Sequence, residues 1–151
     1  MATPFSIDGR TGALRLGCVT LGPGAGKSDV ERRLAHLVRG SRDMRTGYEW
    51  LDLAEVTFGG QPASLGLCFH HGRLCSLGWN VALPGASKAP EGWPTRQSID
   101  NEVAFVRSVL ARDIGFDPKS TYPTEFEWGS VVSVYNDREG VARNAVLYRG
   151  V

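Results

Sequence analysis

Apolar and polar positions first show a clear order between about Ala13 and Leu21, where Leu14, Leu16 and Cys18 alternate with their neighbours. A period of two is typical of a β-strand, so we predict one strand over this segment. The run 22–26 contains three glycines and a proline, and we expect it to end the strand.

Apolar residues then recur at helical spacing and predict a short helix from Asp29 to about Val38. Ser28 and Glu31 match a capping box, in which the hydroxyl accepts from the third helical amide and the carboxylate reaches back. The charged, glycine-containing stretch Gly40–Gly47 predicts a solvated loop.

Three strand-like segments follow in succession and predict a meander: Tyr48–Phe58, Leu65–His70 and Arg73–Val81. His71 and Gly72 predict a two-residue hairpin loop between the last two segments. That loop would place three pairs of residues opposite each other: Leu67 and Ser76, Phe69 and Leu74, and Cys68 and Cys75.

The segment Leu83–Pro94 holds three prolines and two glycines, which predicts a long surface connection. Helical spacing of apolar residues over Ile99–Leu110 predicts a second, longer helix. Ser98 or Asp100 is available as its N-cap, and Gly115 is available to end it.

Alternation returns between Glu125 and Val134, and Asn136–Gly140 turns the chain into a closing strand over Val141–Tyr148. The order of elements is therefore β-α-β-β-β-α-β-β. Hairpin connections favour an antiparallel sheet of about six strands, and the two amphipathic helices are expected to cover one face of it. We expect a single α+β domain over residues 1–151.

The amino-acid composition of the chain argues against some classes of binding partner. Seventeen Lys and Arg against sixteen Asp and Glu leave a net charge of +1, so no overall field favours nucleic acid or an anionic membrane. No apolar run approaches the roughly 20 residues of a membrane span, and the start of the chain lacks the pattern of a signal peptide. Three cysteines without Cys-x-x-Cys spacing favour free thiols in a reducing compartment, so we expect a cytoplasmic location.

The segment Gly22–Ser28 ends in the Gly-Lys-Ser of a phosphate-binding loop. That loop needs four residues between its first glycine and Gly-Lys-Ser, and Gly22 leaves only three before Gly26. An antiparallel meander is also the wrong sheet for a nucleotide-binding core. We therefore expect a tight turn and no bound nucleotide.

Cys68, His70 and Cys75 would suit zinc if they shared one face of the predicted hairpin, with His36 or His71 as a fourth ligand. The tight knuckle turns of structural zinc sites do not occur here, which favours small buried cysteines instead. A Gly-x-Ser-x-Gly elbow is also absent from the sequence. We expect no catalytic residue, no metal and no cofactor.

Four residues are predicted to contact a partner: Trp93, Tyr122, Glu125 and Glu127. The two aromatic residues stand on predicted loops, where Trp and Tyr often dominate interface energetics, although each would also serve as a lid on its own core. The two glutamates alternate on one strand and would lie about 7 Å apart, as a glycosidase pair or as the solvated side of an edge strand.

The stretch from roughly Ile7 to Val81 has a distinct layout: a strand, a Gly/Pro turn, a short helix opening on Ser28-Asp29-Val30-Glu31, and a meander with Phe58–Pro62 and Phe69–Leu74. In this layout it resembles small bacterial immunity proteins encoded beside contact-delivered or secreted polymorphic toxins. The layout also looks like the helix-plus-meander unit of β-lactamase-inhibitor and outer-membrane-assembly lipoprotein domains, which are exported.

The resemblance implies a compact cytoplasmic α+β protein that binds a cognate toxin and blocks its active site without catalysis of its own. Two other classes of function stay open from the residues themselves. One is an enzyme of small-molecule metabolism, and the other is an adaptor or chaperone of a secretion system.

Overall fold

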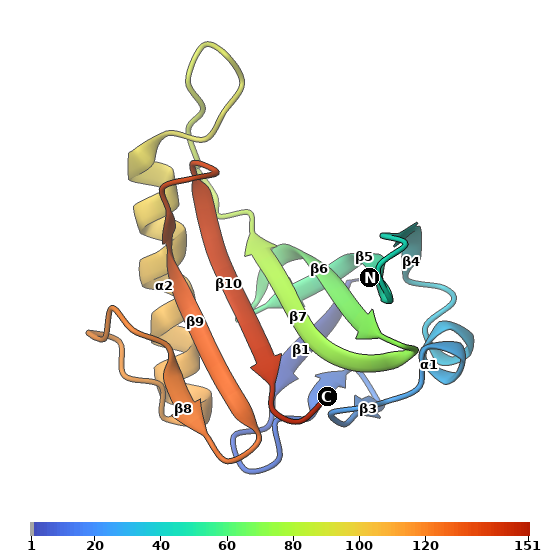
Figure 1. The fold of residues 1–151 in the computed structure, drawn as a ribbon. Coiled ribbons are helices and arrows are strands. Elements are labelled where there is room, and N and C mark those ends of the chain that lie inside the picture. Colours follow the sequence, from blue (N-terminus) through green and yellow to red (C-terminus); the bar gives the residue numbers. More distant parts are fainter. Residues whose placement is uncertain (1) are drawn as a thin grey trace.

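The computed structural model describes residues 2–151 and contains, within that range, ten strands and two helices (Figure 1). The elements in chain order are β1 (Thr3–Ile7), β2 (Leu14–Leu16), β3 (Val19–Leu21), α1 (Lys27–Arg33), β4 (Val38–Asp43), β5 (Tyr48–Phe58), β6 (Gln61–His70), β7 (Arg73–Val81), α2 (Arg96–Ile114), β8 (Thr124–Phe126), β9 (Gly129–Asn136) and β10 (Val141–Tyr148).

All the strands belong to one mixed sheet with the order β3-β2-β1-β5-β6-β7-β10-β9-β8, and β4 pairs with the first half of β5. β1 runs parallel to the second half of β5, and the other pairs are antiparallel. The expectation of an antiparallel sheet of about six strands is therefore wrong in two respects: within residues 2–151 the sheet has ten strands, and one of its pairs is parallel. Strands of only three residues are too short to show a period of two in the sequence. A parallel pair joins segments that are far apart in the chain, so local patterns do not predict it.

Two predicted strands are each broken by a tight turn. The segment from Ala13 to Leu21 divides into β2 and β3 because Gly17 adopts a φ of 58°, a left-handed conformation that favours glycine. The segment from Glu125 to Val134 divides into β8 and β9, since Glu127 and Trp128 form the turn between them.

The first helix is shorter and starts earlier than predicted, and its capping box is wrong. α1 has Gly26 as its N-cap and no side-chain cap. The segment before it docks on the β6–β7 hairpin, where the amides of Gly24 and Lys27 donate to the carbonyls of Leu74 and Gly72, both at 2.8 Å. This docking sets where the helix begins. The first half of the predicted loop Gly40–Gly47 also belongs to β4, which ends at Asp43.

The β6–β7 hairpin has the predicted turn but a shifted register. Phe69 lies opposite Leu74 as expected. A bulge at Cys75 then places Cys68 opposite Ser76 and not opposite Cys75, because one extra residue on β7 displaces all the pairs beyond it. The same bulge sets Leu67 against Leu77.

The second helix matches its prediction closely. α2 ends at Gly115, whose φ of 74° is the left-handed C-cap conformation. Its N-cap is Thr95, whose hydroxyl accepts from the amide of Ser98 at 3.2 Å, so neither Ser98 nor Asp100 has that role. In the range 2–151, neither helix is long and apolar enough to cross a membrane.

The two helices occupy different parts of the sheet. α2 packs against β9 and β10, whereas α1 lies at the other end of the molecule, beside the β6–β7 turn (Figure 1). A buried polar chain fixes α2: the Ser133 hydroxyl donates to Asn144 Oδ1 at 2.7 Å, and Asn144 Nδ2 donates to Glu102 Oε2 at 2.9 Å. The two buried side chains, Ser133 and Asn144, therefore have hydrogen-bond partners inside the core.

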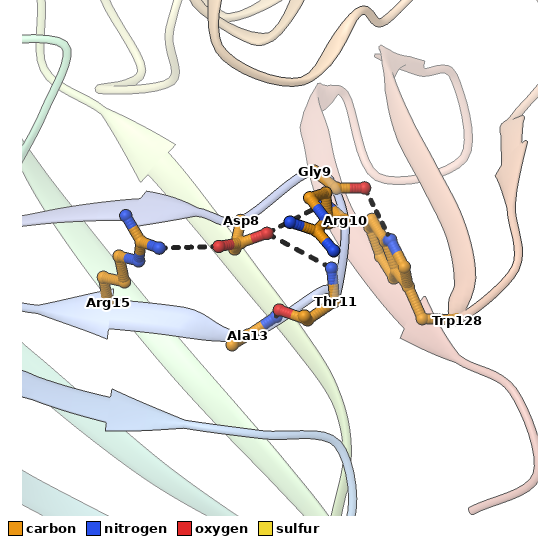
Figure 2. A network of polar contacts seen from close by, with 7 residues as sticks. All are labelled: Asp8, Gly9, Arg10, Thr11, Ala13, Arg15 and Trp128. Carbon is orange, nitrogen blue, oxygen red and sulfur yellow. Dashed lines mark hydrogen bonds and ion pairs between the residues drawn. The ribbon is translucent and has the colours of Figure 1, made fainter.

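The loop between β1 and β2 ties distant strands together at one end of the sheet (Figure 2). Asp8 orders this loop by accepting from the amides of Arg10 and Thr11 at 2.8 and 3.2 Å and from the Arg15 guanidinium at 2.6 Å. These donors, the amides first, lower the pKa of Asp8. Trp128 Nε1 then donates to the carbonyl of Gly9 at 2.9 Å.

A second bond reinforces this closure, because the Tyr148 hydroxyl donates to the carbonyl of Gly12 at 2.6 Å. β1 and β10 are separated in the sheet by β5, β6 and β7, so the contacts hold the two halves of a coiled sheet against each other. The core lies on the inner side of that coil, with α2 across it.

Candidate functional site

The face of the sheet that turns away from the core is uncovered over its central strands, and we call it the open face. Successive side chains of a strand point to opposite sides, so the buried leucines and Trp79 alternate with the residues of this face. Its members are Arg42, Trp50, Asp52, Ser64, Gly66, Ser76, Gly78, Asn80, Arg143, Ala145 and Leu147, and they line a hollow of about 750 Å³.

The floor of the hollow is a row of very small residues on three neighbouring strands. Gly66 of β6 lies directly opposite Gly78 of β7, and Gly78 lies opposite Ala145 of β10. We call these three residues the glycine strip. A Cβ built at Gly78 would come no closer than 3.5 Å to another atom, the carbonyl oxygen of Asn144. The backbone is therefore bare there, with open space above it.

Larger side chains form the walls. The Trp50 ring lies against Gly66, 3.2 Å from the position that a Cβ would take. The Arg42 guanidinium lies 5.5 Å from the Trp50 ring centre and pairs with Asp52 at 3.1 Å. Leu147 of β10 stands on the opposite side with 40% of its surface exposed. The hollow thus has apolar walls and a charged edge.

Charged residues of both signs stand at that edge. Arg42 and Asp52 form an ion pair, while Arg143 and Glu139 make no ion pair or side-chain hydrogen bond to any residue in the range 2–151. A surface with both signs and an apolar centre has the anatomy of a protein-binding site, in which polar groups surround a desolvated anchor.

The predicted contact residues Trp93 and Tyr122 lie outside the open face. Their exposed fractions are 64% and 78%, so neither folds back as a lid on the core. Trp93 belongs to the loop 83–95, which we call the tongue, and Figure 1 shows it projecting beyond the N-terminal end of α2. Tyr122 follows the C-terminal end of α2, so the structure does not bring the two aromatic residues together.

The tongue has hydrogen bonds of its own. The Ala89 amide donates to the carbonyl of Trp93 at 2.7 Å, and the Thr95 amide donates to the carbonyl of Ser87 at 3.2 Å. The hydroxyls of Ser87 and Thr95 also pair at 2.7 Å, next to the start of α2. Trp93 is therefore carried on an ordered projection.

The predicted glutamate pair does not form on one strand. Glu125 is an exposed residue of β8 and pairs with Arg149 at 2.9 Å. Glu127 lies in the turn after β8, because that strand ends at Phe126. The alternation of the two carboxylates along one strand is thus wrong, although both side chains are exposed.

In the Gly-Lys-Ser segment, the groups that would hold a phosphate have other partners. Two of its backbone amides donate to the β6–β7 hairpin, and the Ala25 amide donates to Gly22. The Lys27 ammonium contacts Glu31 at 2.6 Å and Glu49 at 3.1 Å. These carboxylates, Glu31 first, raise the pKa of Lys27. The contacts agree with a turn, and the absence of nucleotide binding stays a prediction.

The cysteines and histidines of the β6–β7 hairpin form no cluster that is suited to a metal. Across residues 2–151, no group of three or more His, Cys, Asp or Glu side chains has such an arrangement. Cys68 is buried, and burial raises the pKa of its thiol to about 11. The His70 ring stacks on Tyr48 with 4.3 Å between ring centres. Cys18, Cys68 and Cys75 are free thiols.

The open face was missed in the sequence, although a signal for it exists. Gly66 and Gly78 stand inside predicted strands, where a glycine has no turn to make and weakens the strand. Trp50 and Asp52 alternate with buried leucines on the neighbouring strand. Reading the polar side of each strand together with its neighbours would have indicated the surface.

Comparisons with known proteins add a likeness of fold. No protein-family model and no curated protein matches the sequence. The structure is similar to a chain in the solved structure of "Rhs1-CT in complex with cognate immunity protein RhsI1", with a TM-score of 0.51 and 15% sequence identity. The match covers 97% of this chain and 87% of that chain. The protein therefore shares its fold with a component of that complex.

Proposed function

We propose that this protein is an immunity protein, which binds a cognate protein toxin and blocks it without catalysis of its own. The observation that carries the proposal is the fold shared with a component of the Rhs1-CT complex over 97% of the chain. The open face supports it, because a sheet face with a bare floor, apolar walls and a charged edge is suited to a protein surface. The toxin would be met in the cytoplasm.

The proposed contact area includes the open face as its centre. It also includes residues predicted from the sequence at two margins of the molecule. Trp93 on the tongue is proposed to add an aromatic contact, since a large ring on an ordered loop docks at a small cost in entropy. Tyr122, Glu125 and Glu127 lie along or beside β8, the outermost strand of the sheet, and are proposed as further contacts there.

Coexpression tests the proposal. Toxin domains encoded beside the gene, and elsewhere in the source genome, are expressed one at a time with and without this protein, and growth is measured. We expect rescue from one specific toxin and from none of the others. Failure to rescue from any of them would overturn the proposal.

Expression of the protein alone is the necessary control, because the matched complex contains two kinds of chain. Unimpaired growth is expected for an immunity protein. Growth arrest by the protein alone would overturn the proposal and would place the chain on the Rhs1-CT side of such a complex.

A further inference from the structure

The glycines of this protein fall into two groups. Thirteen of them have a positive φ, which explains the choice of glycine by backbone conformation. The other six of the 19 glycines have no such φ, and two of these six, Gly66 and Gly78, lie inside long strands. Glycine in a strand interior costs about 0.5 to 1 kcal/mol relative to alanine, so these two positions weaken the sheet without a conformational reason.

A strand glycine often marks a place where another molecule approaches the backbone closely. Gly66 and Gly78 are directly paired, and Ala145 continues the row on the next strand. The space above Gly78 is free, since no atom lies within ordinary contact distance of a Cβ except the Asn144 carbonyl at 3.5 Å. The Trp50 ring lies over Gly66, so the open depression is the part of the strip over Gly78, beside Ala145.

We propose that the glycine strip receives one large apolar side chain, aromatic or long aliphatic, from the toxin partner, and that Arg143 pairs with a carboxylate beside that side chain. This inference rests on the proposed function and names its docking site. Trp50 and Leu147 would hold the inserted side chain between them, and the small floor residues let it reach the backbone. Such a buried apolar anchor within a polar rim is the usual centre of a protein interface.

The geometry favours a protein over a small molecule. Sites for small molecules bury most of the ligand surface, whereas Leu147 is 40% exposed and the Arg42 side chain is 57% exposed. The charge pattern selects the chemistry beside the anchor. Arg42 is neutralised by Asp52, whereas Arg143 forms no ion pair with any residue of the described chain, Glu139 at the same edge included. An acidic group of the partner complements it.

Filling the strip tests the inference. Gly78→Leu adds a side chain on the floor, and Ala104→Leu adds the same side chain on the exposed surface of α2 as a matched control. Affinity for the toxin that the protein neutralises is measured by calorimetry, with an inactivated toxin variant. Gly78→Leu is expected to weaken binding about 100-fold or more, and Ala104→Leu by less than about 3-fold. Gly78→Ala is expected to lie between them.

A second measurement keeps the test valid if Gly78→Leu fails to fold. Hydrogen exchange of the wild-type protein with and without toxin should show protection of 76–80 and 143–147, which carry the floor and one wall. Arg143→Glu, an exposed change that leaves the core intact, should weaken binding about 10-fold, mainly by slowing association.

Each other outcome has a definite meaning. Unchanged affinity of Gly78→Leu, or no protection of the two segments, overturns the inference and leaves the proposed function standing. If the wild-type protein is a dimer and Gly78→Leu converts it to a monomer, the strip binds a second copy of the chain, and this result overturns the inference as well. If no toxin binds at all, the proposed function fails, and the inference fails with it.

Discussion

The open face and the tongue are two exposed regions built in opposite ways. The open face is concave and collects residues from five strands, from Arg42 to Leu147. The tongue is convex and consists of the single stretch 83–95, which is ordered by its own hydrogen bonds. The open face has small residues at its centre, whereas the tongue presents Trp93, a large one.

The comparison shows that an exposed region can be suited to binding in two ways, by a projecting side chain or by a depression. A projecting aromatic residue is recognised as an exposed apolar side chain, and it can insert into a partner. A depression in a sheet is recognised only by the small size of its residues, and it can accept a side chain of a partner between walls that come from separate parts of the chain. Both forms fit an immunity protein, and measurements on tryptophans in the two regions can separate their contributions.

The largest effect is expected beneath the open face. Trp79 packs against Phe5 and Phe58 on the core side of β7, so Trp79→Ala should lower the free energy of unfolding by about 3 to 5 kcal/mol. Trp79→Phe should cost clearly less than Trp79→Ala, because an aromatic ring is kept and the lost Nε1 has no hydrogen-bond partner in the described chain. Urea unfolding measures both. Equal losses for the two variants would contradict the account.

The wall of the open face comes next. Trp50→Ala should weaken toxin binding by about 2 to 4 kcal/mol, since it removes the ring that bounds the glycine strip. Stability should fall by only about 1 kcal/mol, because Trp50 is partly exposed and its ring lies on the outer face of the sheet, over Gly66 and beside Arg42. Calorimetry and urea unfolding give the two values. A loss confined to stability would remove Trp50 from the site.

The tongue should contribute less than the open face. Trp93→Ala is expected to weaken binding by about 2 kcal/mol and to leave the melting temperature nearly unchanged, because the ring is largely exposed in the free protein. Tyr122→Ala, at a still more exposed aromatic residue that is proposed as a contact beside β8, is the comparison variant. If Trp93→Ala lowers stability strongly while affinity stays intact, Trp93 is not part of the contact area.

Alkaline pH should lower the free energy of unfolding by a smaller amount than the substitutions above change stability or binding. Burial raises the pKa of the Cys68 thiol to about 11 and that of the Tyr148 hydroxyl above its usual range. The folded state therefore retains protons that the unfolded state loses, so the free energy of unfolding is highest below about pH 9 and falls as pH rises. The loss should be on the order of 1 kcal/mol per group near pH 10 to 11.

Urea unfolding at pH 8 and pH 10.5 measures that loss. Cys68→Ala and Tyr148→Phe should each reduce the difference between the two pH values, although Tyr148→Phe also removes the hydrogen bond to Gly12. The tongue lacks cysteine and tyrosine, so the protection of 83–95 in hydrogen exchange, after correction for the faster intrinsic exchange at high pH, should change little over the same range. A pH difference that neither variant reduces would contradict the assignment.

Elements whose residues are close in sequence were predictable. The meander, α2 with its glycine stop and the last strand all follow from periods of two or 3.6 residues and from turn residues at their ends. The tongue belongs to this group, because its prolines and Trp93 are neighbours in the chain. Local sequence determines local backbone preference, and these segments need little more than that.

Other features depended on partners that lie far away in the chain. β4 is polar and reads as a loop, yet it pairs with β5, and β1 joins β5 as a parallel neighbour. The start of α1 is set by the β6–β7 hairpin and not by a cap of its own. Hydrogen bonds between strands depend on which backbone groups meet, and a single sequence pattern does not record that.

For function, the sequence by itself determined the exposed aromatic loop and the absence of a spacing that would form a phosphate loop or a Cys-x-x-Cys site. Only the tertiary structure decided that Gly66, Gly78 and Ala145 lie side by side with Trp50 and Leu147 around them. The physical reason is that a depression is a property of neighbouring strands. A single glycine in a strand is a weak signal, and the depression forms only where small residues of three adjacent strands lie side by side.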